Sequence, residues 1–385
     1  IQRIQKKMLK KSIFYLLAVL MMFPQVVETI YSPALPHIAH GFHISSEKAS
    51  QTISLYFIAF ALGIVFWGQM CDILGRRKSI LGGLLIYAIA SIAAILCRSF
   101  DDLIIARMFS AFGAAVGSIG TQTIIRDTFK GKELVKIFSI IGILLALSPA
   151  LGMVFGAFIT TWWGYQGVFL GLALFSILLM CWCVFELPET LIKNNKKVPI
   201  LHIFIAMLKD NEIWKTAFLV ALFNINLFAY YQLSPFYFQI LEASSWVFGL
   251  SGLCLTLGAI FGALLNKSLL NKNVNPHTLV SIAALIAILG SVLIYITLAI
   301  KSWLFIFPVL LIMVAYGLAI PNLLATALKH YAECLGTAGA LLGLMYYLLL
   351  GGGLVLAGWG QNLAAVLLIC SVATLCINLF RHRDV

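Results

Sequence analysis

Long apolar runs constrain this chain more than any other feature of its sequence. Twelve stretches have the length of about 20 residues that a helix needs to cross the hydrocarbon core of a bilayer. Charged residues make up 10% of the 385 residues, against about 25% in a typical soluble domain. Water therefore cannot be the solvent for most of the surface, and we expect a membrane protein.

The runs are predicted to be helices, because each backbone group in lipid must be hydrogen-bonded within its own spanning structure. Barrel strands would alternate polar and apolar residues, and these runs do not. The expected fold class is an all-α membrane protein with twelve spans. The spans are 13–37, 49–70, 79–97, 102–124, 135–159, 164–186, 214–239, 246–266, 277–299, 302–327, 335–359 and 361–380.

One long polar connection interrupts the series and divides it into six plus six spans. Repeats of this kind are common in transporters, and a trace of one survives where Gly68 to Asp72 ends the second run and Gly262 to Asn266 ends the eighth. The expected units are an N-terminal six-helix bundle at 1–186, a cytoplasmic linker at 187–213 and a C-terminal six-helix bundle at 214–385.

The distribution of lysine and arginine tests this layout independently, because basic residues gather in the cytoplasmic loops of membrane proteins. With the N-terminus in the cytoplasm, 22 of the 26 basic residues fall on the cytoplasmic side. Lys48, Arg98 and Lys301 fall on the other side, and Arg107 lies within a span. A wrong number of helices would scramble this asymmetry. We expect a bacterial inner-membrane protein with both termini in the cytoplasm.

The loop after the second run, 68–78, reads Gly-Gln-Met-Cys-Asp-Ile-Leu-Gly-Arg-Arg-Lys. Glycine permits a tight turn, and an aspartate can accept a charge-assisted hydrogen bond from an arginine or a helix N-terminus. Such a cluster can latch helix ends in one state, although a loop that only fixes topology is the alternative. The spacing resembles the G-x-x-x-D-x-x-G-R-R/K signature of the major facilitator superfamily. The matching residues are Gly68, Asp72, Gly75, Arg76 and Arg77.

The fourth and fifth spans add to this resemblance. Arg107 and Gly113 meet the superfamily's R-x-x-x-x-x-G pattern, with snorkelling of the arginine to the surface as the alternative. The fifth span carries Pro149, Gly152 and Gly156 and resembles the G-P-x-x-G-G element of drug:proton antiporters. Small residues four apart also permit ordinary close packing of helices.

Glu28 is the one acid in the interior of a predicted span. A carboxylate is costly to keep charged there, which suits a residue that binds and releases protons or handles a cationic substrate. The first and fourth spans are neighbours in the superfamily that the chain resembles, so we predict that Glu28 and Arg107 act together in proton coupling. A purely structural bridge between them is the alternative.

The segment from Tyr31 to Pro36, together with Gly336 to Gly343, is similar to the Bcr/CflA branch of drug-resistance exporters. That branch reads D-x-Y-x-P-A-L-P in its first helix. Here Thr29 stands in the place of the aspartate, and the acid lies one residue earlier, at Glu28. One residue corresponds to a rotation of about 100° around a helix.

Polar and aromatic side chains are unusually dense in the seventh span. Such residues suggest the wall of a substrate cavity, and hydrogen bonds that join helices are the alternative. The predicted cavity residues are Tyr31, Gln122, Asn224, Asn226, Tyr230, Tyr231, Gln232, Asn322 and Tyr346.

Other chemistries find little support. His37, His40 and His43 are interpreted as a solvated loop, and we expect no metal, because convergent ligands are missing. No GxxxxGK[ST] motif occurs, so an ion gradient rather than ATP is the expected driving force. No cofactor, nucleic acid or catalytic constellation is predicted.

The leading hypothesis is a secondary active transporter that exports a small organic compound, such as a drug, a siderophore or a related metabolite. Proton antiport and alternating access would drive it, with protons, a small-molecule substrate and the lipid bilayer as partners and a monomer as the working unit. An importer or facilitator of a nutrient with the same fold is the alternative. A membrane-embedded enzyme or receptor is disfavoured, because clustered His, Asp or Ser are absent from the sequence.

Overall fold

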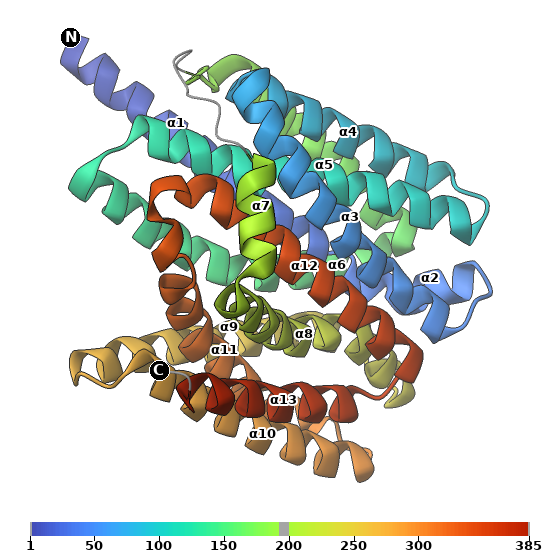
Figure 1. The fold of residues 1–385 in the computed structure, drawn as a ribbon. Coiled ribbons are helices and arrows are strands. Elements are labelled where there is room, and N and C mark those ends of the chain that lie inside the picture. The colour runs from blue at the N-terminus through green and yellow to red at the C-terminus, as the bar shows by residue number, and fades with distance from the viewer. Residues whose placement is uncertain (1, 192–199, 384–385) are drawn as a thin grey trace.

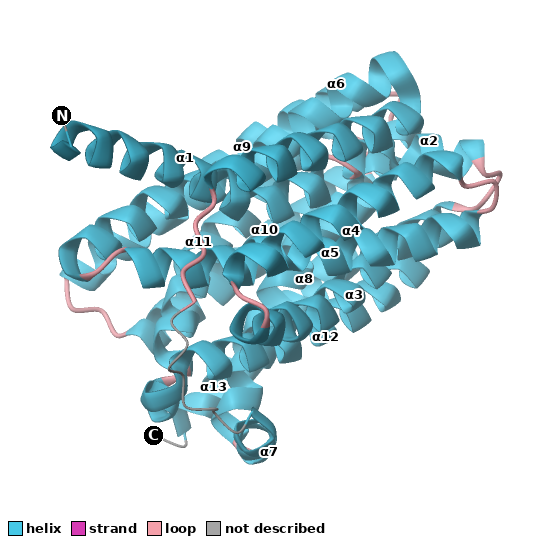
Figure 2. Cartoon of the chain, turned by 90° about the horizontal axis from the view of Figure 1, so that it is seen from above, coloured by secondary structure: helices cyan, strands magenta, loops and turns pink. Residues whose placement is uncertain are grey.

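The computed structural model describes residues 2–191 and 200–383, and nearly all of them are helical (Figures 1 and 2). No strand occurs within these two ranges. The helices lie roughly side by side, and α1 begins at the same end of the molecule at which α13 finishes, on the left of Figure 1. The predicted all-α architecture is confirmed.

The first half of the chain forms six spans. Its first span is interrupted, because Pro33 and Pro36 stand where a new helical turn begins and start two short elements after α1. Proline favours such first-turn positions. The predicted continuous span 13–37 is therefore a helix, a 3-10 turn and a second helix. The elements are α1 (Gln2–Thr29), η1 (Ser32–Ala34), α2 (Leu35–Gly41), α3 (Ser46–Ile73), α4 (Arg76–Leu96), α5 (Phe100–Thr128) and α6 (Gly131–Glu186).

The second half supplies the other six spans. The expected linker, 187–213, contains a helix, α7, and its residues 192–199 lie outside the described residues. The elements are α7 (Ile200–Lys209), α8 (Asn211–Ile240), α9 (Ser245–Asn271), α10 (Pro276–Ala299), η2 (Trp303–Phe305), α11 (Ile306–Ala327), η3 (Lys329–Cys334), α12 (Leu335–Gly360) and α13 (Leu363–Arg383).

Length and composition mark 10 of the described helices as able to cross a membrane. One of them, α6, has 56 residues and leaves helical geometry at Gly164, with φ of 63° and ψ of −167°. It therefore contains two predicted spans, 135–159 and 164–186. The last predicted span corresponds to α13. Its apolar part, Leu363–Leu379, is shorter than in the other spans, so α13 is not among the 10. The predicted count of twelve is confirmed.

The two ends of the bundle differ in charge. We call the end that carries Arg76 and Arg77 the basic end, and the end that carries Lys48, Arg98 and Lys301 the far end. At the far end, short loops lead into helices that begin at serine caps, where the side chain accepts a hydrogen bond from the first turn. These caps are Ser45, Ser99, Ser244 and Ser302.

Close helix contacts follow equivalent patterns in the two halves. A Cβ on Gly63 of α3 would overlap the backbone of α5, and a Cβ on Gly262 of α9 would overlap the backbone of α11. Glycine at these positions lets two spans approach closely. Between the halves, α3 packs against α12 and α6 packs against α9. The two halves are therefore joined by two separate pairs of helices.

Candidate functional site

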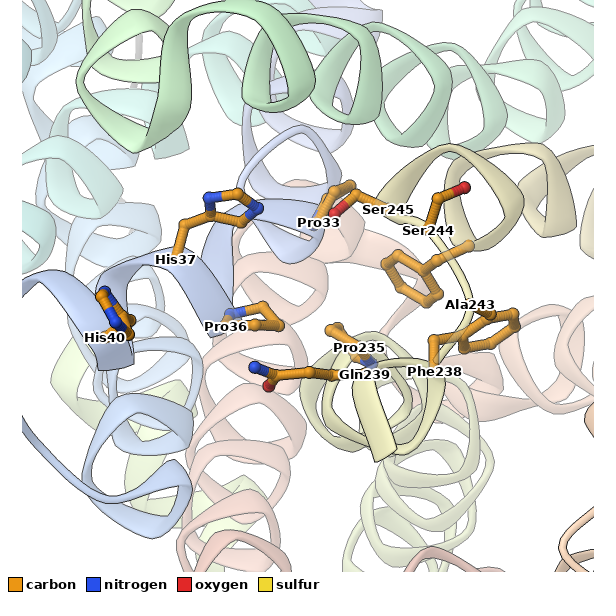
Figure 3. Close-up of a pocket in the computed structure, with 11 residues that line it drawn as sticks. Pro33, Pro36, His37, His40, Pro235, Phe238, Gln239, Ala243, Ser244 and Ser245 are labelled. Atoms are coloured by element: carbon orange, nitrogen blue, oxygen red, sulfur yellow. The ribbon is translucent and has the colours of Figure 1, made fainter. Parts of the chain in front are cut away.

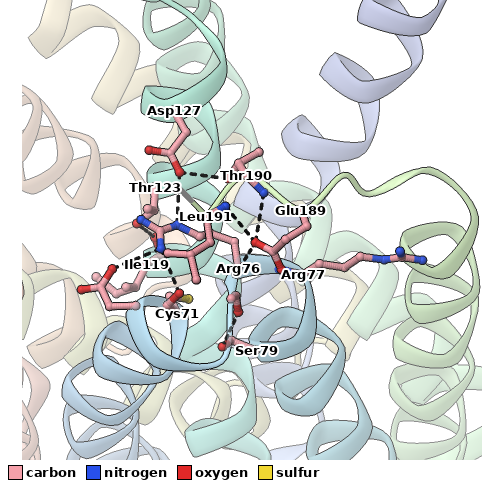
Figure 4. Close-up of polar contacts among 12 residues, drawn as sticks. Cys71, Arg76, Arg77, Ser79, Ile119, Thr123, Asp127, Glu189, Thr190 and Leu191 are labelled. Atoms are coloured by element: carbon pink, nitrogen blue, oxygen red, sulfur yellow. Dashed lines mark hydrogen bonds and ion pairs between the residues drawn. The ribbon is translucent and has the colours of Figure 1, made fainter. Parts of the chain in front are cut away.

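The predicted 68–78 loop consists of the end of α3, a short turn at Leu74 and Gly75, and the first residues of α4. Polar and ionic contacts hold it at the basic end (Figure 4), and we keep the name 68–78 loop for it. Gly75 precedes α4 with a φ of 102°, a backbone conformation that favours glycine. The Arg76 guanidinium is buried and lies 3.1 Å from the carboxylate of Asp127 and 3.4 Å from that of Asp72. The loop thus joins the ends of α3, α4 and α5.

Glu189 completes this cluster, and sequence reasoning missed it. Its carboxylate accepts hydrogen bonds from the backbone N–H groups of Arg76 at 3.0 Å and Arg77 at 3.2 Å, which begin α4. Burial favours the neutral acid, but hydrogen bonds from Leu191, Arg76, Arg77 and Thr190 outweigh it and hold the pKa of Glu189 below its usual range. The available signal was an acid three residues after the end of α6, because a carboxylate is favoured at a helix N-terminus such as that of α4.

A cavity of about 530 Å³ lies next to this loop, between α3, α5, α11 and α12. Gly68 and Asp72 are among its lining residues, so the loop borders the cavity. Of the residues predicted to form a substrate cavity, Gln122 and Tyr346 line it. The other polar lining residues are Gln69, Ser118, Thr123, Arg126, Asp127, Thr337 and Tyr347.

Tyr346 and Tyr347, which line the cavity, belong to a cluster of aromatic rings. The ring of Tyr347 lies 4.4 Å from that of Tyr346, 5.1 Å from that of Phe60 and 6.0 Å from that of Phe57. Phe57 in turn lies 4.4 Å from Phe228 of α8. These centroid distances describe an aromatic cluster where α3, α8 and α12 meet.

Glu28 and Arg107 lie in the interior, away from the loop. Glu28 is partly buried, and its Oε1 is buried with no hydrogen-bond partner. Arg107 is 2% exposed, and its guanidinium carbon lies 4.0 Å above the ring of Tyr31 and 4.5 Å above that of Tyr56. The two charged groups are close enough for electrostatic attraction. Across the described ranges, however, no carboxylate lies within 4.0 Å of the Arg107 nitrogens.

The fifth-span motif fits directly against α1. A Cβ on Gly152 would overlap Thr29 and the carbonyl of Val26, and a Cβ on Gly156 would overlap the backbone of Ile30. Pro149 lies inside the same helix. Close packing, one of the two interpretations of this motif, therefore occurs next to Glu28.

A seam of neutral hydrogen bonds joins the halves toward the far end. The amide nitrogen of Gln232 in α8 lies 3.0 Å from the Ser50 carbonyl, 2.9 Å from the Ser54 hydroxyl and 3.0 Å from the Leu354 carbonyl. Gln51 donates to the Val355 carbonyl at 3.2 Å. We call these contacts the glutamine seam.

More hydrogen bonds reinforce the same region. The amide of Gln361 donates to the Ser50 hydroxyl at 3.0 Å, and the Ser32 hydroxyl donates to the carbonyl of Tyr231. Tyr237 donates to the Gln361 carbonyl at 3.1 Å. Helices of both halves thus contact each other at the far end, whereas the 530 Å³ cavity lies toward the basic end.

The other predicted cavity residues lie outside the lining of that cavity. Gln232 bonds across to Ser50 and Ser54, and the carbonyl of Tyr231 accepts a hydrogen bond from Ser32. Four others hydrogen-bond between helices of the second half. Asn224 accepts from Tyr316 at 3.3 Å, Asn226 donates to Ser371 at 3.2 Å, Tyr230 bonds to Ser251 at 2.6 Å, and Asn322 donates to Asn266 at 2.7 Å. Tyr31 lies under Arg107 instead.

Two of the histidines line a second cavity, of about 400 Å³, at the far end (Figure 3). His37 and His40 belong to α2 rather than to an irregular loop, and they face Pro235 and Gln239 of α8. The described part of the chain holds no cluster of three or more His, Cys, Asp or Glu suited to a metal ion.

Comparisons with known proteins agree with this geometry. The family model of the Major Facilitator Superfamily matches residues 16–357. An uncharacterized transporter of Rickettsia bellii is 31% identical over 360 residues, covering 89% of each chain. The bicyclomycin resistance protein homolog of Haemophilus influenzae is 26% identical over 334 residues, covering 85% of this chain and 84% of the relative. A crystal structure of a bacterial homolog of the lysosomal transporter Spinster superposes with a TM-score of 0.78 at 16% identity, covering 97% of both chains.

The chain therefore belongs to the major facilitator superfamily, and it is a multi-pass membrane transporter of small molecules rather than an enzyme. The relative associated with bicyclomycin resistance is consistent with the resemblance to the drug:proton antiporter branch. The structural likeness to the Spinster homolog supports the fold alone.

Proposed function

We propose that this transporter exports a small organic compound in exchange for protons, by alternating access. Two bundles, 1–186 and 214–385, would rock about the central cavity while the linker 187–213 joins them. The present structure would then be the state open toward the cytoplasm. The asymmetric charge distribution supports cytoplasmic termini in a bacterial inner membrane, and we propose a monomer as the working unit.

The observation that carries this proposal is the environment of Glu28. Its carboxyl group is an acid in the interior of the spans, with one buried oxygen that has no partner and with Arg107 nearby. A group in this setting favours the neutral form until a positive charge approaches. Moving one proton down a 100 mV potential releases about 2.3 kcal/mol, which can drive export of a compound against its gradient.

The remaining predicted residues take complementary roles in this scheme. Gly68, Asp72, Gly75, Arg76 and Arg77 hold helix ends at the basic end and control opening there. Pro149, Gly152 and Gly156 seat the fifth span against Glu28's own helix. The substrate enters beside Gln122 and Tyr346. The polar residues of α8 approach it as the bundles move.

The substrate class is a drug, a siderophore or a related metabolite. The name of the Haemophilus relative makes bicyclomycin the first compound to try. A ligand that binds the native protein raises its unfolding temperature. Thermal unfolding in detergent, with bicyclomycin and a panel of amphiphilic compounds, therefore identifies the compound for flux measurements.

The role of Glu28 is tested in everted membrane vesicles with an imposed pH gradient, using the compound that stabilises the protein most. The Glu28→Gln variant is expected to fall to the transport level of vesicles without the protein, because glutamine cannot exchange a proton. Glu47→Gln changes an exposed acid at the far end and is expected to transport normally. Full gradient-driven transport by Glu28→Gln would sink the proposed coupling.

A further inference from the structure

The surroundings of Arg107 suggest a role for two tyrosines in the interior. The guanidinium carbon lies 4.0 Å from the ring centroid of Tyr31 and 4.5 Å from that of Tyr56. All three side chains are almost fully buried. A desolvated cation over aromatic faces is attracted by their negative quadrupoles, and arginine forms this contact readily because it is planar.

Both members of the Glu28–Arg107 pair are left with unsatisfied atoms. Nε and Nη1 of Arg107 are buried without hydrogen-bond partners, and so is Oε1 of Glu28. A buried ion without a counter-ion is strongly destabilising unless something compensates its charge. In this structure the rings of Tyr31 and Tyr56 present their faces to the charged guanidinium, and Tyr87 of α4 also lies near it.

We propose that Tyr31 and Tyr56 form an aromatic clamp for Arg107, and that the guanidinium exchanges between this clamp and the Glu28 carboxylate. The clamp holds Arg107 while Glu28 carries a proton. When Glu28 releases the proton, its negative charge attracts Arg107 away from the rings. The two tyrosines are then positioning residues for proton coupling, and this inference rests on the proposed proton exchange at Glu28.

The clamp and the carboxylate belong to different elements of the fold. Glu28 is in the last turn of α1, which ends at Thr29, whereas Tyr31 directly precedes the 3-10 turn that begins at Ser32. The interruption of the first span thus lies between the acid and one half of the clamp. Tyr56 belongs to α3, so the clamp also joins two spans.

The other groups around the pair do not titrate near neutral pH. They come from the turn between α1 and η1 and from α3, α4, α8, α11 and α12, and each of those identified among the described residues is a tyrosine, whose phenol ordinarily ionises near pH 10. The group facing Glu28 or Arg107 consists of Tyr31, Tyr56, Tyr87, Tyr231, Tyr316 and Tyr347. Because His37 and His40 lie at the far end and histidine ordinarily titrates near pH 6.5, the part of a conformational change between pH 5 and 9 that is lost in Glu28→Gln reports the proton on Glu28.

The test measures conformation without a substrate. Spin labels at Glu47→Cys and Glu242→Cys, in a full-length protein whose eight native cysteines are replaced, report the far-end distance between the halves. This distance is recorded from about pH 5 to pH 9 in liposomes. Without the clamp, Arg107 is free to pair with ionised Glu28. Tyr31→Leu and Tyr56→Leu are thus each expected to lower the midpoint by about one pH unit, a tenfold change in proton affinity.

The matched variants Tyr31→Phe and Tyr56→Phe keep the aromatic face, and they are expected to keep the wild-type midpoint. Two separate leucine variants leave the test intact if one of them does not fold. Wild-type midpoints in the leucine variants, or equal shifts in the phenylalanine variants, would overturn the clamp. Glu28→Gln is expected to abolish the pH dependence. If it does not, the proton role of Glu28 fails, and the clamp fails with it.

Discussion

At the scale of single residues, Gly75 is bound to its position by two independent constraints. Its φ of 102° disfavours any residue with a side chain, and a Cβ there would overlap the Glu189 carboxylate. Gly131 makes a matched comparison, because its φ of 52° is also positive but a Cβ added to it would meet nothing within 4 Å. Of the two glycines, Gly75 alone combines backbone strain with a collision.

Gly75→Ala is expected to destabilise the protein by about 1–3 kcal/mol, since strain of this kind costs that much at one residue and the Glu189 cap on α4 is displaced as well. The Gly131→Ala control carries the strain but not the collision. Thermal unfolding in detergent measures both variants. An equal or larger loss of stability in Gly131→Ala would contradict the collision with Glu189.

The Glu189 carboxylate predicts a dependence of stability on pH. Because its folded-state pKa is depressed, it adds stability above its unfolded value of about 4.3, and that stability is lost as the pH falls through the folded-state pKa. Glu189→Gln is therefore expected to flatten the acid side of the curve of unfolding temperature against pH. Exposed Glu242→Gln serves as the control. If the unfolding temperature of Glu189→Gln falls at acid pH as steeply as that of the wild type, the cap adds no stability.

The sequence predicted the role of Arg76 in the 68–78 loop but not that of Glu189. Arg76 belongs to a local motif whose spacing is visible in eleven consecutive letters. Glu189 lies 113 residues further along the chain, and only the packing of α6 beside α4 brings its carboxylate to that helix N-terminus. Local spacing predicts turns and caps well, whereas a partner supplied by another helix depends on tertiary packing.

At the scale of elements, α8 shows the same limit. Its density of polar residues predicted a cavity wall, but a pattern along one helix does not say which neighbour each side chain meets. Asn226 and Tyr230 bond to helices of their own half, and Gln232 reaches across to Ser50 and Ser54 of the other half. The number of spans was predictable because apolar length and loop charge are properties of the chain alone.

Gln232→Leu is expected to open the far end. The amide has two hydrogens for three acceptors, of which those on Ser50 and Ser54 belong to the other half. A net loss of about 1–3 kcal/mol for these bonds raises the population open at the far end by about 5-fold to 150-fold. The far-end distance between spin labels at Glu47→Cys and Glu242→Cys measures this shift. Gln239→Leu changes the same residue type two turns further along α8 and is expected to keep the wild-type distance. A closed far end in Gln232→Leu would contradict the role of the seam.

At the scale of the whole molecule, the structure is asymmetric along its length. A cavity borders the charged 68–78 loop at the basic end, and neutral amides join the halves toward the far end. The uneven distribution of lysine and arginine along the sequence already distinguishes these two ends. If the two bundles rock as rigid bodies, the glutamine seam would open at the far end while the 68–78 loop closes the basic end. One cavity could then face each side in turn.

Exchange of protons for a compound is the central claim, and a pH indicator trapped in proteoliposomes tests it most directly. The compound that stabilises the protein most is added outside, with no pH gradient at the start. Antiport predicts that the compound enters as protons leave, so the lumen becomes alkaline, and that Glu28→Gln shows no change. A lumen that turns acidic, as symport requires, or entry of the compound without a pH change, as facilitated diffusion requires, would contradict the account.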